Sequence, residues 1–321
     1  MNLKSLPIRK FAIAAMLTGL VTESFGCTGT LPSESSFDEP SSDSSLAAYF
    51  INPEICKDDV GPNCTQLRLG DSHLTTSAPA VGKLFSCSAG NPNAPGSEKS
   101  LITWIDYSSG TWNLLRKPFL PAATGSIGAL GTVTVTDAEG TRTIQSNNLP
   151  LDGKIGDWPM TKYPLLTTID RNPGTPAESS VNFVLESHPT IAASPTCVGF
   201  GSIGVTLNGV ELYNSVDGRG DDAVANEIVD VYGGHPAMTA YHYHHVPERL
   251  DAAPDTDGHS GIIGYIRDGF ALYGYRGVGG RELSNADLDE CHGHTHDTLG
   301  YHYHATIEYP YTVGCYRGTP R

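Results

Sequence analysis

Two identical Tyr-His-Tyr-His tetrapeptides, at residues 241–244 and 301–304, are the part of this sequence best suited to chemistry. Side chains alternate along a β-strand, so a strand would turn both histidines of each tetrapeptide to one face and both tyrosines to the other. Each pair of imidazoles can then reach one ion, and pairing of the two strands would bring four imidazoles together. These four candidate metal ligands are His242, His244, His302 and His304.

The tetrapeptides are the ends of a longer repeat. Asp230 and then a Gly-His pair ending at His235 precede the first tetrapeptide, and Asp289 and a Gly-His pair ending at His294 precede the second. This recurring order predicts two equivalent half-sites. It adds His235 and His294 to the candidate ligands. Asp230 and Asp289 are then candidates for the carboxylates that orient the imidazoles by hydrogen bonds.

A metal site is favoured because most of the twelve histidines fall between residues 235 and 304. Imidazole binds zinc, copper, iron and nickel, and a nitrogen-rich shell without thiolates suits zinc or copper. We therefore expect zinc or copper as the bound metal. The alternative is a structural or adhesion module in which buried histidines form a hydrogen-bonded network without metal.

A metal-dependent extracytoplasmic enzyme, a hydrolase or an oxidoreductase, is a further alternative. A metal with an open position could activate water or oxygen, and Asp268 or Glu290 would then act as the catalytic proton carrier. Asp268 directly precedes Gly269, so a turn aspartate that accepts backbone amides is a simpler interpretation of that residue. Glu290 lies within the second copy of the repeat.

The elements that must position these residues are short strands. A composition of 36 Gly, 22 Pro and 15 Tyr favours strands joined by turns, which predicts a mainly β protein. One segment, residues 221–231, has Val224, Ile228 and Val231 at helical spacing and predicts a short helix. Asn208-Gly209 is a strong signal for a hairpin turn. The expected strands are residues 101–105, 111–115, 131–136, 180–185, 203–207 and 262–266.

The N-terminus is typical of an exported protein. Basic residues precede an apolar run at residues 11–21, which predicts a signal peptide over residues 1–26. Cys27 follows in a context that loosely resembles a lipoprotein signal, and the Ser-, Asp- and Glu-rich residues 27–50 are typical of a tether. We expect an extracytoplasmic protein, either a membrane-anchored cell-envelope lipoprotein with lipid on Cys27 or a secreted protein.

The cysteine count supports an oxidising compartment. Of seven cysteines, removal of Cys27 leaves six, enough for three disulfides whose pairing the sequence leaves open. Three of them lie in residues 51–100, which we expect to be a loop-rich segment, and residues 101–321 are expected to form one domain. The six cysteines are Cys56, Cys64, Cys87, Cys197, Cys291 and Cys315.

The formal net charge of −15 argues against nucleic acid as a partner, because the sequence has no basic cluster to oppose phosphate repulsion. A metal ion is the expected partner. Membrane contact is expected only through an N-terminal lipid.

These motifs resemble the YHYH domain family, which is named after the tetrapeptide. The resemblance extends over residues 101–321 and implies an exported or membrane-attached bacterial protein, without implying a reaction. Besides the two tetrapeptides it is carried by Gly234-His235-Pro236, Asp268-Gly269-Phe270, Leu288-Asp289-Glu290-Cys291, Tyr309-Pro310-Tyr311 and Gly314-Cys315.

Overall fold

A computed structural model describes residues 45–57, 61–124, 130–251, 254–296 and 299–321. The expected signal peptide, Cys27 and the tether as far as residue 44 lie outside the described residues. Strands account for 28% of the structure and helices for 12%, so the prediction of a mainly β protein is confirmed. Within the described ranges, no helix combines the length and the apolar character needed to cross a membrane.

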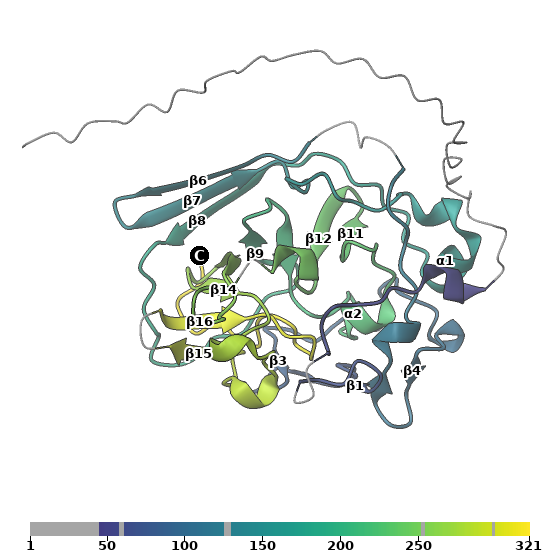
Figure 1. Ribbon diagram of the computed structural model, residues 1–321, viewed down its shortest axis with the longest axis horizontal. Coiled ribbons are helices and arrows are strands. Elements are labelled where there is room, and N and C mark those ends of the chain that lie inside the picture. The colour runs from purple at the N-terminus through teal and green to yellow at the C-terminus, as the bar shows by residue number, and fades with distance from the viewer. Residues whose placement is uncertain (1–44, 58–60, 125–129, 252–253, 297–298) are drawn as a thin grey trace, which may run out of the picture. The chain divides into compact units, whose positions relative to one another are not determined.

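The largest element is an eight-stranded sheet built from the repeat (Figure 1). In Figure 1, β9 lies between β12 and β14. From one edge to the other the strands are β11 (Gly234–Ala237), β12 (Ala240–Tyr243), β10 (Glu211–Tyr213), β9 (Ser202–Thr206), β13 (Ile262–Ile266), β14 (Ala271–Tyr273), β16 (Gly300–His304) and β15 (Gly293–His296).

The two halves of this sheet have the same topology. An antiparallel hairpin, β9–β10 or β13–β14, is followed by a second hairpin, β11–β12 or β15–β16, whose later strand pairs parallel with the first hairpin. The duplication thus begins at Ile203 and Ile263, well upstream of the segments in which the sequence shows it.

The two tetrapeptide strands do not pair with one another. Four strands, β10, β9, β13 and β14, separate β12 from β16. The expectation that four imidazoles from both tetrapeptides meet at one ion is therefore wrong. Each half of the sheet carries its own histidine cluster instead, because each tetrapeptide strand pairs within its own repeat.

The halves join through β9 and β13, where two glycines allow close backbone contact. Val205 pairs with Tyr265 at the centre of an antiparallel register. A Cβ atom added to Gly204 would lie 2.6 Å from the carbonyl oxygen of Tyr265, and one added to Gly264 would be closer still to the carbonyl of Val205. Both positions therefore require glycine for steric reasons.

A smaller sheet covers the middle of one face. It consists of β6 (Val133–Ala138), β7 (Thr141–Ser146) and β8 (Val181–Glu186) in antiparallel order. Ile144 and Phe183 of this sheet pack with Val205 and Tyr265. Residues that pair across adjacent strands point to the same face of a sheet. One such row runs from Val205 through Glu211 and His242 to His235, so these histidines lie on the face covered by the small sheet, toward one edge of the large sheet.

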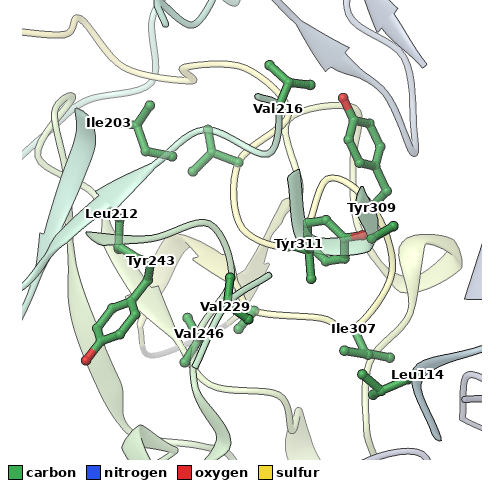
Figure 2. Packing of buried hydrophobic residues seen from close by; sticks show 14 of the residues in the cluster. Leu114, Ile203, Leu212, Val216, Val229, Tyr243, Val246, Ile307, Tyr309 and Tyr311 are labelled. Carbon is green, nitrogen blue, oxygen red and sulfur yellow. The ribbon is translucent and has the colours of Figure 1, made fainter. Parts of the chain in front are cut away.

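The opposite face of the sheet belongs to the main hydrophobic core. Leu212, Tyr243, Leu272 and Tyr303 point into it and are fully buried. Figure 2 shows Leu212 and Tyr243 in one part of this core, beside Ile203, and Tyr309 and Tyr311 in another. The tyrosines of both tetrapeptides thus face away from the histidines, as the period of a strand requires.

The described part of residues 51–100 belongs to the same compact unit as the other described residues up to Arg321. This loop-rich segment contributes Leu67, Leu69 and Leu84 to the main core, so packing holds it as well as disulfides. Its strands are β1 (Leu67–Arg68), β2 (Leu74–Thr75) and β3 (Leu84–Phe85). The predicted disulfides are present, as Cys56–Cys64, Cys87–Cys197 and Cys291–Cys315.

The helices are short. The predicted helix at residues 221–231 is reduced to α2 (Ala223–Asn226), which begins after Asp222, whose side chain accepts the amide of Ala225, and ends before Glu227. Near the strands expected at residues 101–105 and 111–115, the structure has an antiparallel hairpin of β4 (Ile105–Asp106) and β5 (Thr111–Trp112), whose strands are shorter than expected. A second helix of the described residues is α1 (Pro164–Ile169), and 3-10 turns lie at Leu46–Tyr49, Lys99–Leu101, Leu114–Arg116, Met160–Lys162, Glu248–Leu250, Val278–Gly280 and Asn285–Asp287.

Candidate metal centres

The first cluster consists of His235, His242 and His244. His235 on β11 pairs in register with His242 on β12, and His244 directly follows β12. The Nε2 atoms of His242 and His244 are 3.1 Å apart, and the ring of His235 lies 4.5 Å from that of His242. All three side chains are at most 4% exposed, so the cluster is enclosed.

Hydrogen bonds to backbone carbonyls determine which ring nitrogen of His242 and His244 carries the hydrogen. The Nδ1 atom of His242 lies 3.0 Å from the carbonyl oxygen of Ala240, and Nδ1 of His244 bonds the carbonyl of Asn214. A carbonyl only accepts, so in each ring Nδ1 carries the hydrogen and Nε2 keeps a lone pair. Two lone pairs then face each other, an arrangement that repels unless a cation or a proton lies between them.

Burial keeps these imidazoles neutral. It lowers the pKa of His244 to about 4 and the pKa values of His235 and His242 well below the usual range. Near neutral pH, therefore, no proton lies between the Nε2 atoms of His242 and His244 to offset the repulsion of their lone pairs. Within the described residues, neither ring nitrogen of His235 has a hydrogen-bond partner. A neutral imidazole with a free lone pair is the form that binds a metal ion.

The second cluster consists of His259, His294, His302 and His304. Successive Nε2 atoms are separated by 3.1 Å between His259 and His304, 3.2 Å between His304 and His302, and 3.2 Å between His302 and His294. A tetrahedral ion with metal–nitrogen bonds of about 2.0–2.1 Å sets its ligand atoms about 3.3–3.4 Å apart. The spacing is close to what such an ion requires.

Three rings of the second cluster have their hydrogen on Nδ1. The acceptors are the carbonyl oxygens of Ser260, Gly300 and Gly274, at 2.7, 3.0 and 2.7 Å from His259, His302 and His304 respectively. Three Nε2 lone pairs therefore converge. Burial lowers the pKa of His302 to about 3 and that of His304 well below its usual range, so these two rings are neutral.

Aromatic rings cover both clusters at equivalent positions of the repeat. Tyr213 stacks on His242 with ring centres 3.9 Å apart, and Tyr273 lies against His302 at 4.5 Å. His259, His302 and His304 are at most 1% exposed. His294 is half-buried, so the second cluster is nearer to solvent than the first.

Residues 182–282 match the family model described as YHYH protein. The resemblance to the YHYH family is confirmed over this region. The YHYH region so defined runs from β8 to the 3-10 turn after β14, and it includes the first tetrapeptide and His259. It ends before β15 and β16, so the match is shorter than the resemblance expected over residues 101–321. No curated protein and no solved structure matches the chain.

The structure adds two residues that the sequence did not indicate, and both lie in the YHYH region. His259, in the loop before β13, completes the second cluster. The equivalent residue before β9 is Gly199, so comparison of the two repeats could not identify His259 as a ligand. Glu227 lies beside the first cluster, with Oε2 3.7 Å from Nε2 of His235 and 4.0 Å from Nε2 of His244. Burial, with Asp170 nearby, raises the pKa of Glu227 well above its usual range.

Asp230 and Asp289 do not orient the imidazoles as expected. Asp230 accepts the amide of Gly156 at 2.7 Å and the hydroxyl of Tyr241 at 2.8 Å. Asp289 likewise accepts the amide of Gly293 at 3.0 Å and the hydroxyl of Tyr301 at 3.2 Å. These carboxylates hold the turn before each hairpin and the outer tyrosine of each tetrapeptide, because the imidazoles already have backbone carbonyls as acceptors.

The two candidate catalytic residues lie outside the clusters. Asp268 accepts the hydroxyl of Tyr303 at 2.6 Å and the amide of Gly318 at 2.9 Å, on the core side of the sheet and not on the histidine side. It behaves as the turn aspartate that Gly269 indicates. Glu290 is half-buried beside disulfide-bonded Cys291 and belongs to neither histidine group.

Proposed function

We propose that the protein binds a transition-metal ion at each of its two histidine clusters, one in each repeat. The observation that carries this proposal is the second cluster, where Nε2 of His304 lies 3.1 and 3.2 Å from those of His259 and His302. All three rings hold their hydrogen on Nδ1. A metal ion would turn three opposed lone pairs into three bonds.

Zinc and copper suit this donor set best. The ligands are imidazoles, and the six described cysteines are all in disulfides, so no thiolate among them is free to bind. A network of hydrogen-bonded histidines without metal is less well supported, because carbonyls hold the ring hydrogens of five histidines. No hydrogen is then left between the Nε2 atoms of His242 and His244, or among those of His259, His302 and His304.

Enclosure favours a structural or storage role for the ions. Catalytic zinc keeps an open position for water, whereas structural sites are closed by four protein ligands. The histidine rings are buried, Tyr213 stacks on His242 and Tyr273 lies against His302, which leaves little room for a substrate. Asp268 faces the other side of the sheet, which removes the main support for an enzyme.

We also propose that the protein is exported. Three disulfides fit an extracellular protein, since such bonds persist in oxidising compartments. The signal peptide, and the lipid on Cys27, are expected from the N-terminal sequence.

Elemental analysis of the purified protein tests metal binding. We expect two ions per chain, one after His242→Ala, one after His302→Ala and none in the double variant. His292→Ala is the control, because this buried histidine bonds Thr306 and belongs to neither cluster; it should keep both ions. A wild-type protein that holds no metal and takes up neither zinc nor copper would contradict the proposal.

A further inference from the structure

Glu227 gives the first cluster a feature that the second lacks. Its carboxylate faces two imidazoles, with Oε2 3.7 Å from His235 Nε2 and 4.0 Å from His244 Nε2. Among the described residues, the basic side chains within 4.0 Å of this carboxylate are these two histidines. Both imidazoles are neutral, so the carboxylate gains no opposite charge from them. A buried carboxylate needs such a charge, and a metal ion between the four side chains would supply it.

Nearby Lys117 attracts the carboxylate but forms no ion pair with it within 4.0 Å among the described residues. The ammonium of this buried lysine donates to the backbone carbonyl of Glu227. Asp170, another acid close to Lys117, accepts the amide of Ile228 at 2.8 Å. The position of Glu227, directly after α2, is thus held by its backbone, which leaves its carboxylate free to point toward the histidines.

The two repeats complete their clusters with different residues. Glu227 stands three residues before Asp230, and the residue three before Asp289 is Ala286. Conversely, His259 stands three residues before β13, and the residue three before β9 is Gly199. Each repeat therefore supplies a fourth donor that the other repeat lacks.

We propose that Glu227 is the fourth ligand of the first metal site, so that this site has three nitrogen donors and one oxygen donor while the second site has four nitrogen donors. This inference rests on the proposed function. A carboxylate favours harder divalent ions such as Mn²⁺ over soft Cu⁺, and imidazoles alone favour copper and zinc. The two sites therefore differ in the ions that they select.

The test measures metal affinity at the first site alone. In the His302→Ala background the second site is removed, and Zn²⁺ and Mn²⁺ are titrated by calorimetry into the protein with Glu227 or with Glu227→Gln. We expect Zn²⁺ affinity to fall at least about 10- to 100-fold with glutamine, which is the loss found when a residue that only supports a ligand is removed. Mn²⁺ binding should be lost. Glu227→Asp, which keeps the charge and withdraws it by one methylene, should lie between the two.

Glu211→Gln is the matched control. Glu211 pairs in register with His242 but its carboxylate bonds Asn148, so its variant should keep the full affinity. An unchanged Zn²⁺ affinity in both Glu227→Gln and Glu227→Asp would overturn the assignment of Glu227. Absence of binding with Glu227 intact would instead contradict the metal proposal for the first cluster. In the His242→Ala background, Glu227→Gln should leave the second site unchanged, which also verifies folding.

Discussion

The imidazole of His304 connects three parts of the fold. Its Nδ1 bonds the carbonyl of Gly274 after β14, while its Nε2 faces His302 on the same strand and His259 from another loop. His244 has the corresponding bond to Asn214 after β10. At the scale of single residues, each cluster is therefore oriented by main-chain carbonyls, which have fixed positions in the sheet.

The tetrapeptide histidines could be predicted from the sequence because alternation along a strand determines which side chains share a face. The partners of Asp230 could not, because Gly156 and Trp158 are distant in sequence and come near only in the folded chain. His259 and Glu227 were missed for a different reason, because neither recurs in the other repeat.

Replacement of Asp268 by alanine should destabilise the protein without removing metal. The hydroxyl of Tyr303 and the amides of Arg317 and Gly318 would lose a buried acceptor, at a cost of about 2–4 kcal/mol. Urea denaturation measures the loss, and elemental analysis should still find both ions. Loss of metal with unchanged stability would instead place Asp268 in a metal site.

At the scale of elements, the hairpins of each repeat bring together histidines of that repeat alone. The Asn208-Gly209 turn predicts the β9–β10 hairpin correctly, since its conformational preference is local. Pairing of β12 with β10 and of β16 with β14 is parallel and joins distant segments. Such pairing depends on the whole sheet, so the sequence did not reveal the separation of the tetrapeptides.

Gly264→Ala should weaken the junction between the halves. The added methyl group would overlap the carbonyl of Val205 on β9, and the strands would have to separate. A loss of about 1–3 kcal/mol is expected from such overpacking. Thermal denaturation measures it. Gly199→Ala is the control, because no atom lies within 4 Å of its added Cβ, and it should unfold like the wild type. Equal stability of both variants would contradict a tight junction.

At the scale of the whole molecule, buried neutral histidines make the metal-free protein sensitive to acid. Burial lowers the pKa of His244 to about 4 and those of His292 and His302 to about 3. In the unfolded chain these residues have a pKa of about 6.5, so below that pH the unfolded state binds protons that the folded state does not. The stability contributed by these histidines is therefore fully present above pH 6.5 and is lost as the pH falls toward 4 for His244 and toward 3 for His292 and His302.

Urea denaturation of the protein in EDTA should show this loss. Each of these histidines should lower the free energy of unfolding by about 1.4 kcal/mol per pH unit between the two pKa values. His292→Gln should reduce the slope by one such contribution, since glutamine does not titrate. Because buried acids such as Asp222, whose pKa is raised to about 7, act in the opposite direction, the comparison with His292→Gln is the decisive one. An unchanged slope in His292→Gln would show that this ring is not buried as described.

The register of β9 against β13 places Val205 opposite Tyr265, residues at equivalent positions of the two repeats. The sheet is thus the single-chain counterpart of a symmetric dimer, in which the same surface of each subunit meets its own copy. A chain with one repeat would leave β9 as an open edge, and the strand best suited to pair with that edge is β9 of a second molecule. In such an arrangement a metal ligand of one repeat can be replaced without a change in the other repeat. One fold could then hold two different metal ions.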